Sequence, residues 1–160
     1  MSMIDFDKAV QLVESNSAKA RFAGPRGALI GEAEALLGGR FPPTYRSFLE
    51  RFGALTFGSM EVYGITTGDF SRSTKFTTGN GIGLTLESRK SFGLPVRFVI
   101  IARTGDGDFY VLELSGERES PVFVYQPGYS AVLQTRMEVV AALDELRTRA
   151  SETPQWEFCE

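Results

Sequence analysis

Two aspartates in a glycine-containing stretch have the spacing that comes closest to a chemical site. They lie in Gly105-Asp106-Gly107-Asp108. Such a carboxylate pair could bind a metal ion or belong to a phosphate site, but one Asp-x-Asp supplies too few ligands for a calcium loop. Asp-Gly is a favoured hairpin-turn dipeptide, because glycine accepts a positive φ at no steric cost. The sequence therefore favours a hairpin turn, whose exposed carboxylates could also contact a basic partner.

Charge is unevenly distributed around this turn. Residues 104–120 contain five acidic side chains and one basic side chain, whereas residues 71–103 contain six basic side chains and one acidic. If the two stretches are neighbours in the fold, their charges partly cancel on a solvated surface. If they are not, the acidic stretch forms a patch that attracts a basic macromolecule and speeds its association.

Missing residue types exclude several kinds of catalysis. The sequence contains no histidine, so Ser-His-Asp catalysis and imidazole zinc sites are impossible. Its one cysteine is Cys159, which allows neither a disulfide framework nor a CxxC motif. The formal net charge of −3 disfavours binding to nucleic acids or membrane surfaces.

A glycine-rich stretch, residues 79–83, superficially resembles a nucleotide-binding loop. Its spacing is not G-x-G-x-x-G, and neither a strand nor a suitably placed acidic residue accompanies it. We therefore expect a flexible loop before a helix.

The length and composition predict one globular domain over residues 1–160. Hydrophobic residues make up 42% and charged residues 23% of the 160 residues, which is ordinary for a folded domain. No apolar run approaches the 18 residues of a membrane span, and the first residues lack the basic-then-apolar order of a secretory signal. We expect a cytoplasmic protein.

Apolar periodicity predicts helices in the first third of the chain. The expected helices cover residues 6–14, residues 29–37, which Gly38-Gly39 would end, and a segment from Pro43 to Phe52, before Gly53. Residues 15–27 are expected to form a connector. Short strands follow at residues 55–57 and 60–65, and then a long polar loop at residues 66–83.

The second half of the chain alternates between helix and strand. We expect a helix at residues 84–92, a central strand at 96–102 that is covered on both faces, and strands at 109–114 and 122–125. A long helix over about residues 137–149 and a tail at 151–160, packed on the body, would complete the chain. The fold class is therefore α+β, with a central, mostly antiparallel or mixed sheet that helices flank.

Three stretches of the chain resemble the SUKH superfamily, in its Smi/Knr-like branch. The first runs from Ile30-Gly31-Glu32 through Phe41-Pro42-Pro43-Thr44-Tyr45 to Phe52-Gly53. The second runs from Leu94-Pro95 through Gly105-Asp106-Gly107-Asp108 to Leu112. The third is Pro121 to Tyr125 followed by Ser130 to Leu146, which is similar to the closing strand and final helix of the family. The resemblance spans about residues 27–146 and departs from the family at Phe52, where Asn is usual.

The resemblance implies a binding protein that is not an enzyme, and we expect no catalytic residue, no metal and no cofactor. Bacterial members are mostly immunity proteins that bind a cognate toxin domain, often a nuclease, and block it. Fungal relatives act as non-catalytic scaffolds in cell-wall signalling, which leaves a regulatory scaffold as the alternative. A carboxylate enzyme such as a glycosidase is a third class, but no paired acids occupy a recognisable cleft pattern.

Charge and loop position select the expected contacts with a toxin domain. The acidic side chains would pair with basic toxin residues, and one exposed tyrosine would add apolar area. The candidates are Asp69, Asp106, Asp108, Glu113, Glu117, Glu119 and Tyr129.

Overall fold

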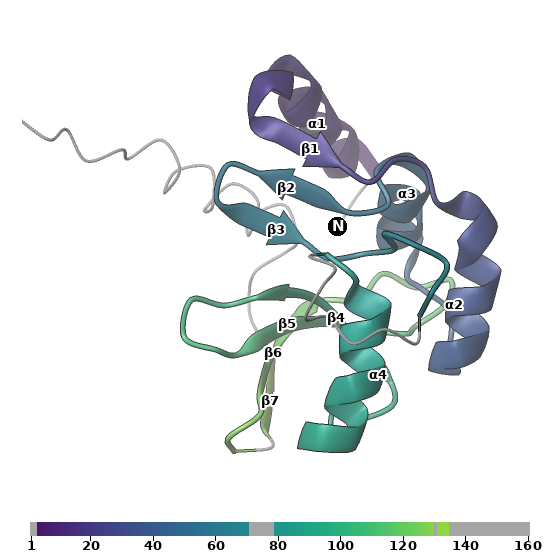
Figure 1. Cartoon of the computed structure of the whole chain (residues 1–160), viewed down its shortest axis with the longest axis vertical. Coiled ribbons are helices and arrows are strands. Elements are labelled where there is room, and N and C mark those ends of the chain that lie inside the picture. The colour runs from purple at the N-terminus through teal and green to yellow at the C-terminus, as the bar shows by residue number, and fades with distance from the viewer. Residues whose placement is uncertain (1–2, 71–78, 130, 135–160) are drawn as a thin grey trace, which may run out of the picture.

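The computed structural model describes residues 3–70, 79–129 and 131–134 (Figure 1). Several predictions concern residues outside these ranges. They are the helix over about residues 137–149, the tail at 151–160 with Trp156 and Cys159, and part of the polar loop.

The helices begin and end where local signals favour it. They are α1 (Met3–Ser15), α2 (Ile30–Leu37), α3 (Pro43–Arg51) and α4 (Gly81–Phe92), with short 3-10 turns at Ser17–Lys19 and Gly27–Leu29. Gly38 ends α2 with φ +77°, and Gly53 follows α3 with φ +71°, a conformation that side chains other than glycine rarely adopt. Pro43 is the first residue of α3, where its missing N–H leaves no helical hydrogen bond unmade. The helices predicted at residues 6–14, 29–37 and 43–52 are therefore confirmed.

The strands form two antiparallel sheets. The first has the order β1 (Ala20–Phe22), β2 (Leu55–Phe57), β3 (Met60–Val62), and the second has the order β4 (Phe98–Arg103), β5 (Phe109–Glu113), β6 (Val122–Gln126), β7 (Ala131–Gln134). The α+β class is confirmed, but two sheets replace the expected central one. The sequence prediction also missed β1 and β7, because these strands are too short to show an alternating pattern.

Strand β4 lies at the edge of its sheet and not at its centre, which corrects the prediction for residues 96–102. Both of its faces are covered, because Phe98 and Ile100 pack in one apolar cluster and Val99 and Ile101 in the other. Its outer edge is also occupied. The Tyr63 amide donates to the Ile101 carbonyl (2.7 Å), and the Ile100 amide donates to the Thr85 hydroxyl (2.9 Å). This edge therefore joins the two sheets and α4 (Figure 1).

Helix α4 starts at Gly81, three residues before the predicted start at Leu84. The Asn80 side chain accepts a hydrogen bond from the Gly83 amide (3.1 Å) and caps the helix. Asn80 and the first residues of α4 are buried, and the Gly81 amide donates to the Gly64 carbonyl (2.9 Å). Residues 79–83 are thus a buried helix start rather than the expected flexible loop.

Tyr45 is a buried polar residue in the larger apolar cluster. Its hydroxyl donates to the Tyr63 carbonyl (2.8 Å), so α3 is tied to the segment that leaves β3. Burial raises the pKa of the Tyr45 hydroxyl, because the charged form would lose its hydration.

This burial predicts a loss of stability in alkali. An unfolded tyrosine ionises near pH 10, and the folded pKa is higher, so the stabilisation is complete below pH 10 and declines above it. Tyr45→Phe should lower the free energy of unfolding by about 1 kcal/mol at pH 7. Above pH 10 it should reduce the slope of that free energy by up to about 1.4 kcal/mol per pH unit. Urea titrations at pH 7 to 11.5 measure both, and an unchanged slope would contradict the assignment.

Candidate functional site

The β4–β5 hairpin carries two of the predicted contact residues. The Thr104 amide donates to the Asp108 carbonyl (2.9 Å), and Gly107 has φ +92°, which confirms the predicted turn. Asp106 is exposed, while Asp108 is half-buried and accepts a hydrogen bond from Gln126 (3.1 Å). The nearby β6–β7 turn presents Tyr129, whose exposed fraction is 84%. Asp106, Asp108 and Tyr129 thus lie at the same end of the four-stranded sheet.

The remaining acidic candidates of the stretch lie at the opposite end of β5. Glu113 is its last residue, and Glu117 and Glu119 belong to the β5–β6 connection. Five strand residues separate the two ends by about 13 Å. The structure therefore divides the acidic stretch between two places instead of gathering it into one patch.

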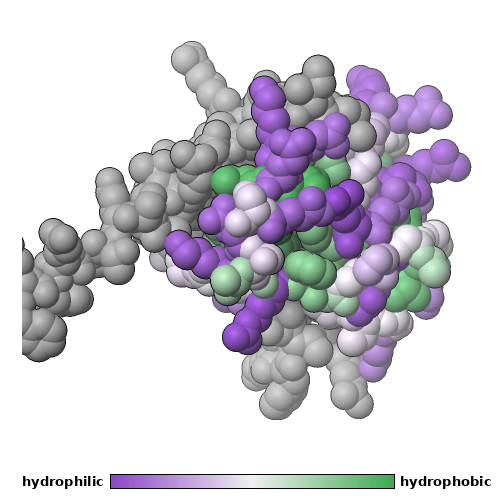
Figure 2. Space-filling view, turned by 90° about the horizontal axis from the view of Figure 1, so that it is seen from above, coloured by the Kyte–Doolittle hydropathy of each residue, from purple (hydrophilic) through white to green (hydrophobic). Residues whose placement is uncertain are grey.

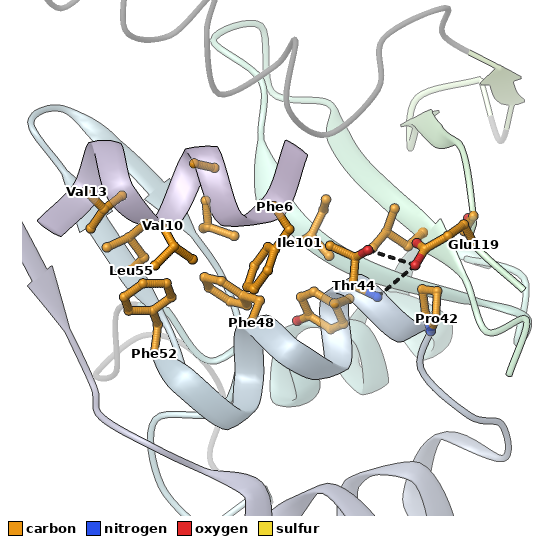
Figure 3. Close-up of a pocket in the computed structure, with 15 residues that line it drawn as sticks. Phe6, Val10, Val13, Pro42, Thr44, Phe48, Phe52, Leu55, Ile101 and Glu119 are labelled. Atoms are coloured by element: carbon orange, nitrogen blue, oxygen red, sulfur yellow. Dashed lines mark hydrogen bonds between the residues drawn. The ribbon is translucent and has the colours of Figure 1, made fainter. Parts of the chain in front are cut away.

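Glu119 makes a structural contact within the chain. Its Oε1 accepts hydrogen bonds from the amide (3.0 Å) and the hydroxyl (2.7 Å) of Thr44, in the first turn of α3 (Figure 3). Pro42 precedes this helix and has no side-chain cap to offer. The Glu119 carboxylate takes the place of such a cap, which is favourable at a helix N-terminus.

Basic side chains lie near the acidic residues at both ends of β5. Arg97 lies 4.0 Å from Glu113, and Arg103 packs over the Phe109 ring, next to the hairpin. These contacts favour the alternative in which the negative charges of the acidic stretch and the positive charges of the basic stretch partly cancel. Asp69, in the loop after β3, is exposed and takes part in an interaction within the chain.

An apolar crevice lies between α1 and α3 and is also lined by strand residues of both sheets (Figure 3). Phe6, Val10 and Val13 of α1 point toward Phe48 and Phe52 of α3. Its volume is about 60 Å³, well below the roughly 300 Å³ at which small-molecule pockets begin. The crevice is therefore a packing gap between two helices and not a ligand site.

A more open, polar depression of about 430 Å³ lies between the α2–α3 connection and the β5–β6 turn. Its lining residues are Glu34, Arg40, Phe41, Pro43, Arg46, Gly116 and Glu117. Glu34 pairs with Arg46 and accepts a hydrogen bond from the Phe41 amide (3.0 Å). Glu117 thus shares this depression with two arginines, one of which is already paired.

Arg89 is a residue that the sequence reasoning did not single out. Its guanidinium donates to the Leu37 carbonyl (2.9 Å), at the end of α2, and to the Val96 carbonyl, in the turn before β4. Burial lowers the pKa of Arg89. Its Nε is buried and has no hydrogen-bond partner in the described part of the chain. The helical pattern could not reveal this role, because both acceptors are distant backbone carbonyls.

Aromatic side chains differ sharply in exposure. Tyr63, Phe70 and Tyr125 are buried and belong to the core rather than to an interface. The large hydrophobic residues exposed among those described are Phe22, Leu36, Phe92, Val96 and Tyr129. Figure 2 shows a face of the molecule on which hydrophilic residues surround hydrophobic ones.

Within residues 3–70, 79–129 and 131–134, no three His, Cys, Asp or Glu side chains meet in an arrangement that could hold a metal ion. Among the same residues, no helix has the length and apolar character needed to cross a membrane.

The sequence comparisons identify the family. The family model SUKH_6, described as "SMI1-KNR4 cell-wall", matches residues 28–135, which is more than half of the chain. The chain belongs to this SUKH family. The comparison with curated proteins gave no match. The match begins one residue after the start of the predicted resemblance and ends before the predicted final helix. SUKH domains are known as immunity proteins and are generally non-catalytic.

Proposed function

We propose that this SUKH protein is an immunity protein that binds and neutralises a cognate bacterial toxin domain by covering it. Membership of the family over residues 28–135 carries the proposal. Occlusion needs a rigid surface and no bond chemistry. The backbone hydrogen bonds that join β3, β4 and the start of α4 provide such rigidity.

The hairpin end of the four-stranded sheet is the first candidate for contact with the toxin. Asp106, Asp108 and Tyr129 project from two turns that adjacent strands hold in register. Two of the other acidic candidates are less suited to direct contact, because Glu119 binds Thr44 and Glu113 lies beside Arg97. Exposed carboxylates act mainly through the rate of association with a basic partner.

This role predicts a salt-dependent association rate. Raising the ionic strength from about 0.01 M to 0.15 M shortens the screening length from roughly 30 Å to 8 Å, so binding to the toxin domain should slow severalfold. Asp106→Asn combined with Asp108→Asn should weaken this dependence and leave the dissociation rate nearly unchanged. Stopped-flow measurements across a salt series test it. A rate that does not change with salt would contradict steering by these carboxylates.

Co-expression tests the function itself. A candidate toxin domain, taken from a gene that neighbours the gene of this chain, is expressed in a sensitive host, with and without the full chain. Survival only in the presence of the chain supports the proposal. A catalytically inactive toxin domain controls for the burden of expression. Death in both cases, with the chain folded and present, would contradict the proposal and favour another role.

A further inference from the structure

Three exposed hydrophobic residues lie on or next to the segments that Arg89 joins. Leu36 precedes Leu37, whose carbonyl accepts from Arg89, and the carbonyl of Val96 accepts from the same guanidinium. Phe92 lies one helical turn after Arg89 on α4, and residues three apart are neighbours on a helix surface. Leu36 is 47% exposed, Phe92 48% and Val96 71%. We call Leu36, Arg89, Phe92 and Val96 the Arg89 patch.

Packing among the described residues leaves these three side chains outside the core. Helix α2 turns Ile30, Ala33 and Leu37 into the core and leaves Leu36 outside, and α4 buries Leu84, Thr85 and Ser88 but not Phe92. An exposed apolar group around an arginine has the composition of an interface centre, where aromatic residues and arginine are enriched.

Charge indicates the chemistry of the partner. Lys90 and Arg97 are exposed and follow Arg89 in the sequence, so residues 87–97 carry three cations and one anion, Glu87. Glu113 adds a second carboxylate, 4.0 Å from Arg97. This local excess of positive charge contrasts with the net charge of −3 of the whole chain. A second copy would bring like charges together, whereas a surface with carboxylates would match them.

We propose that the Arg89 patch anchors the toxin domain, through an apolar side chain of the toxin that carboxylates flank. This inference rests on the proposed function and identifies the surface that holds the complex together. The apolar side chain would pack against Phe92 and Val96, and the carboxylates would face Lys90 and Arg97. The acidic hairpin then governs how fast the partners meet, and the Arg89 patch governs how slowly they separate.

Variants on the two surfaces distinguish these roles. Phe92→Ala combined with Val96→Ala should raise the dissociation constant for the inactive toxin domain about 30-fold or more, mostly through faster dissociation. Lys90→Glu should weaken binding about fivefold or more. Both variants should stay folded, because the side chains are exposed. Phe22→Ala, which removes an aromatic side chain that is 57% exposed on β1 and lies outside both proposed contact surfaces, is the matched control and should change the constant less than threefold.

Binding rates and oligomeric state together distinguish a toxin anchor from a dimer interface. Surface plasmon resonance gives the rates, and size-exclusion chromatography with light scattering gives the oligomeric state of each variant. If the unmodified chain binds the toxin domain and the patch variants bind equally well, the Arg89 patch is not the anchor and the proposed function stands. A dimer of the unmodified chain that the patch variants dissociate would assign the patch to a second copy and overturn the inference. If the unmodified chain does not bind, the proposed function fails and the inference fails with it.

Discussion

Gly64→Ala should lower the free energy of unfolding by at least about 3 kcal/mol. An added Cβ at this position would overlap the Gly53 carbonyl oxygen and lie 2.8 Å from the Leu49 Cδ2 atom. The carbonyl belongs to a turn that cannot withdraw, because it accepts the Ile65 amide (2.8 Å). Gly64 itself is held from the other side, where its amide donates to Gly79 (2.8 Å). The added methyl group would therefore push apart the segments around Gly53 and Gly64, which now pack backbone against backbone.

Gly31→Ala is the matched control for this substitution. Gly31 lies in α2, and an added Cβ there would meet no atom within 4 Å. Alanine should stabilise the chain by up to about 1 kcal/mol, because glycine loses more backbone entropy in a helix. Chemical denaturation of both variants gives the two changes. Equal effects, or a Gly64→Ala variant as stable as the unmodified chain, would show that the close approach at Gly64 is not needed.

Thr85→Val should destabilise the chain by about 2 kcal/mol, although the two side chains have nearly the same shape. The Thr85 hydroxyl donates to the Gly81 carbonyl (2.7 Å) and accepts from the Ile100 amide (2.9 Å). Valine would leave the Ile100 amide buried without a partner, at the edge of β4. Thr85 is fully buried, so water cannot easily replace the lost hydroxyl.

Ser88→Ala, one turn along the same helix, should have the opposite effect. The Ser88 hydroxyl is also buried, but it has no hydrogen-bond partner in the described part of the chain. Removing it should leave the stability unchanged or raise it by up to about 1 kcal/mol. Thermal and urea unfolding of both variants test the pair. A loss of stability at Ser88 as large as at Thr85 would contradict the assigned hydrogen bonds.

Local signals predicted several elements of the fold correctly. Pro43 at the start of α3, Gly53 after it and Gly107 in the β4–β5 hairpin have strong conformational preferences, so the sequence near them is informative. The apolar stripe of α3 and the apolar run of β4 were also recognised, because a helix buried on one face repeats every three to four residues and a strand buried on both faces is apolar throughout. The family motifs over residues 28–135 consist largely of these caps, turns and core residues.

The candidate site was harder to predict, because its properties depend on distant contacts. Composition showed an acidic stretch at residues 104–120, but strand register separates Asp106 and Asp108 from Glu113 by the length of β5. The sequence predicted that Glu119 is free to contact a partner. Its contact with Thr44, 75 residues earlier, instead places it at the start of α3. The sequence showed Arg89 as one of several basic residues in a stretch. Its guanidinium in fact donates to backbone carbonyls of two other segments, at Leu37 and Val96.

The sequence by itself determined the α+β class, the family, and the absence of histidine chemistry, since these follow from residue types and from patterns a few residues long. Only the tertiary structure decided which charged side chains are paired within the chain and which apolar side chains remain exposed to solvent. The physical reason is that hydrogen bonding and burial depend on what packs against a residue. At Glu119, Thr85 and Arg89 that partner comes from a different element of the fold.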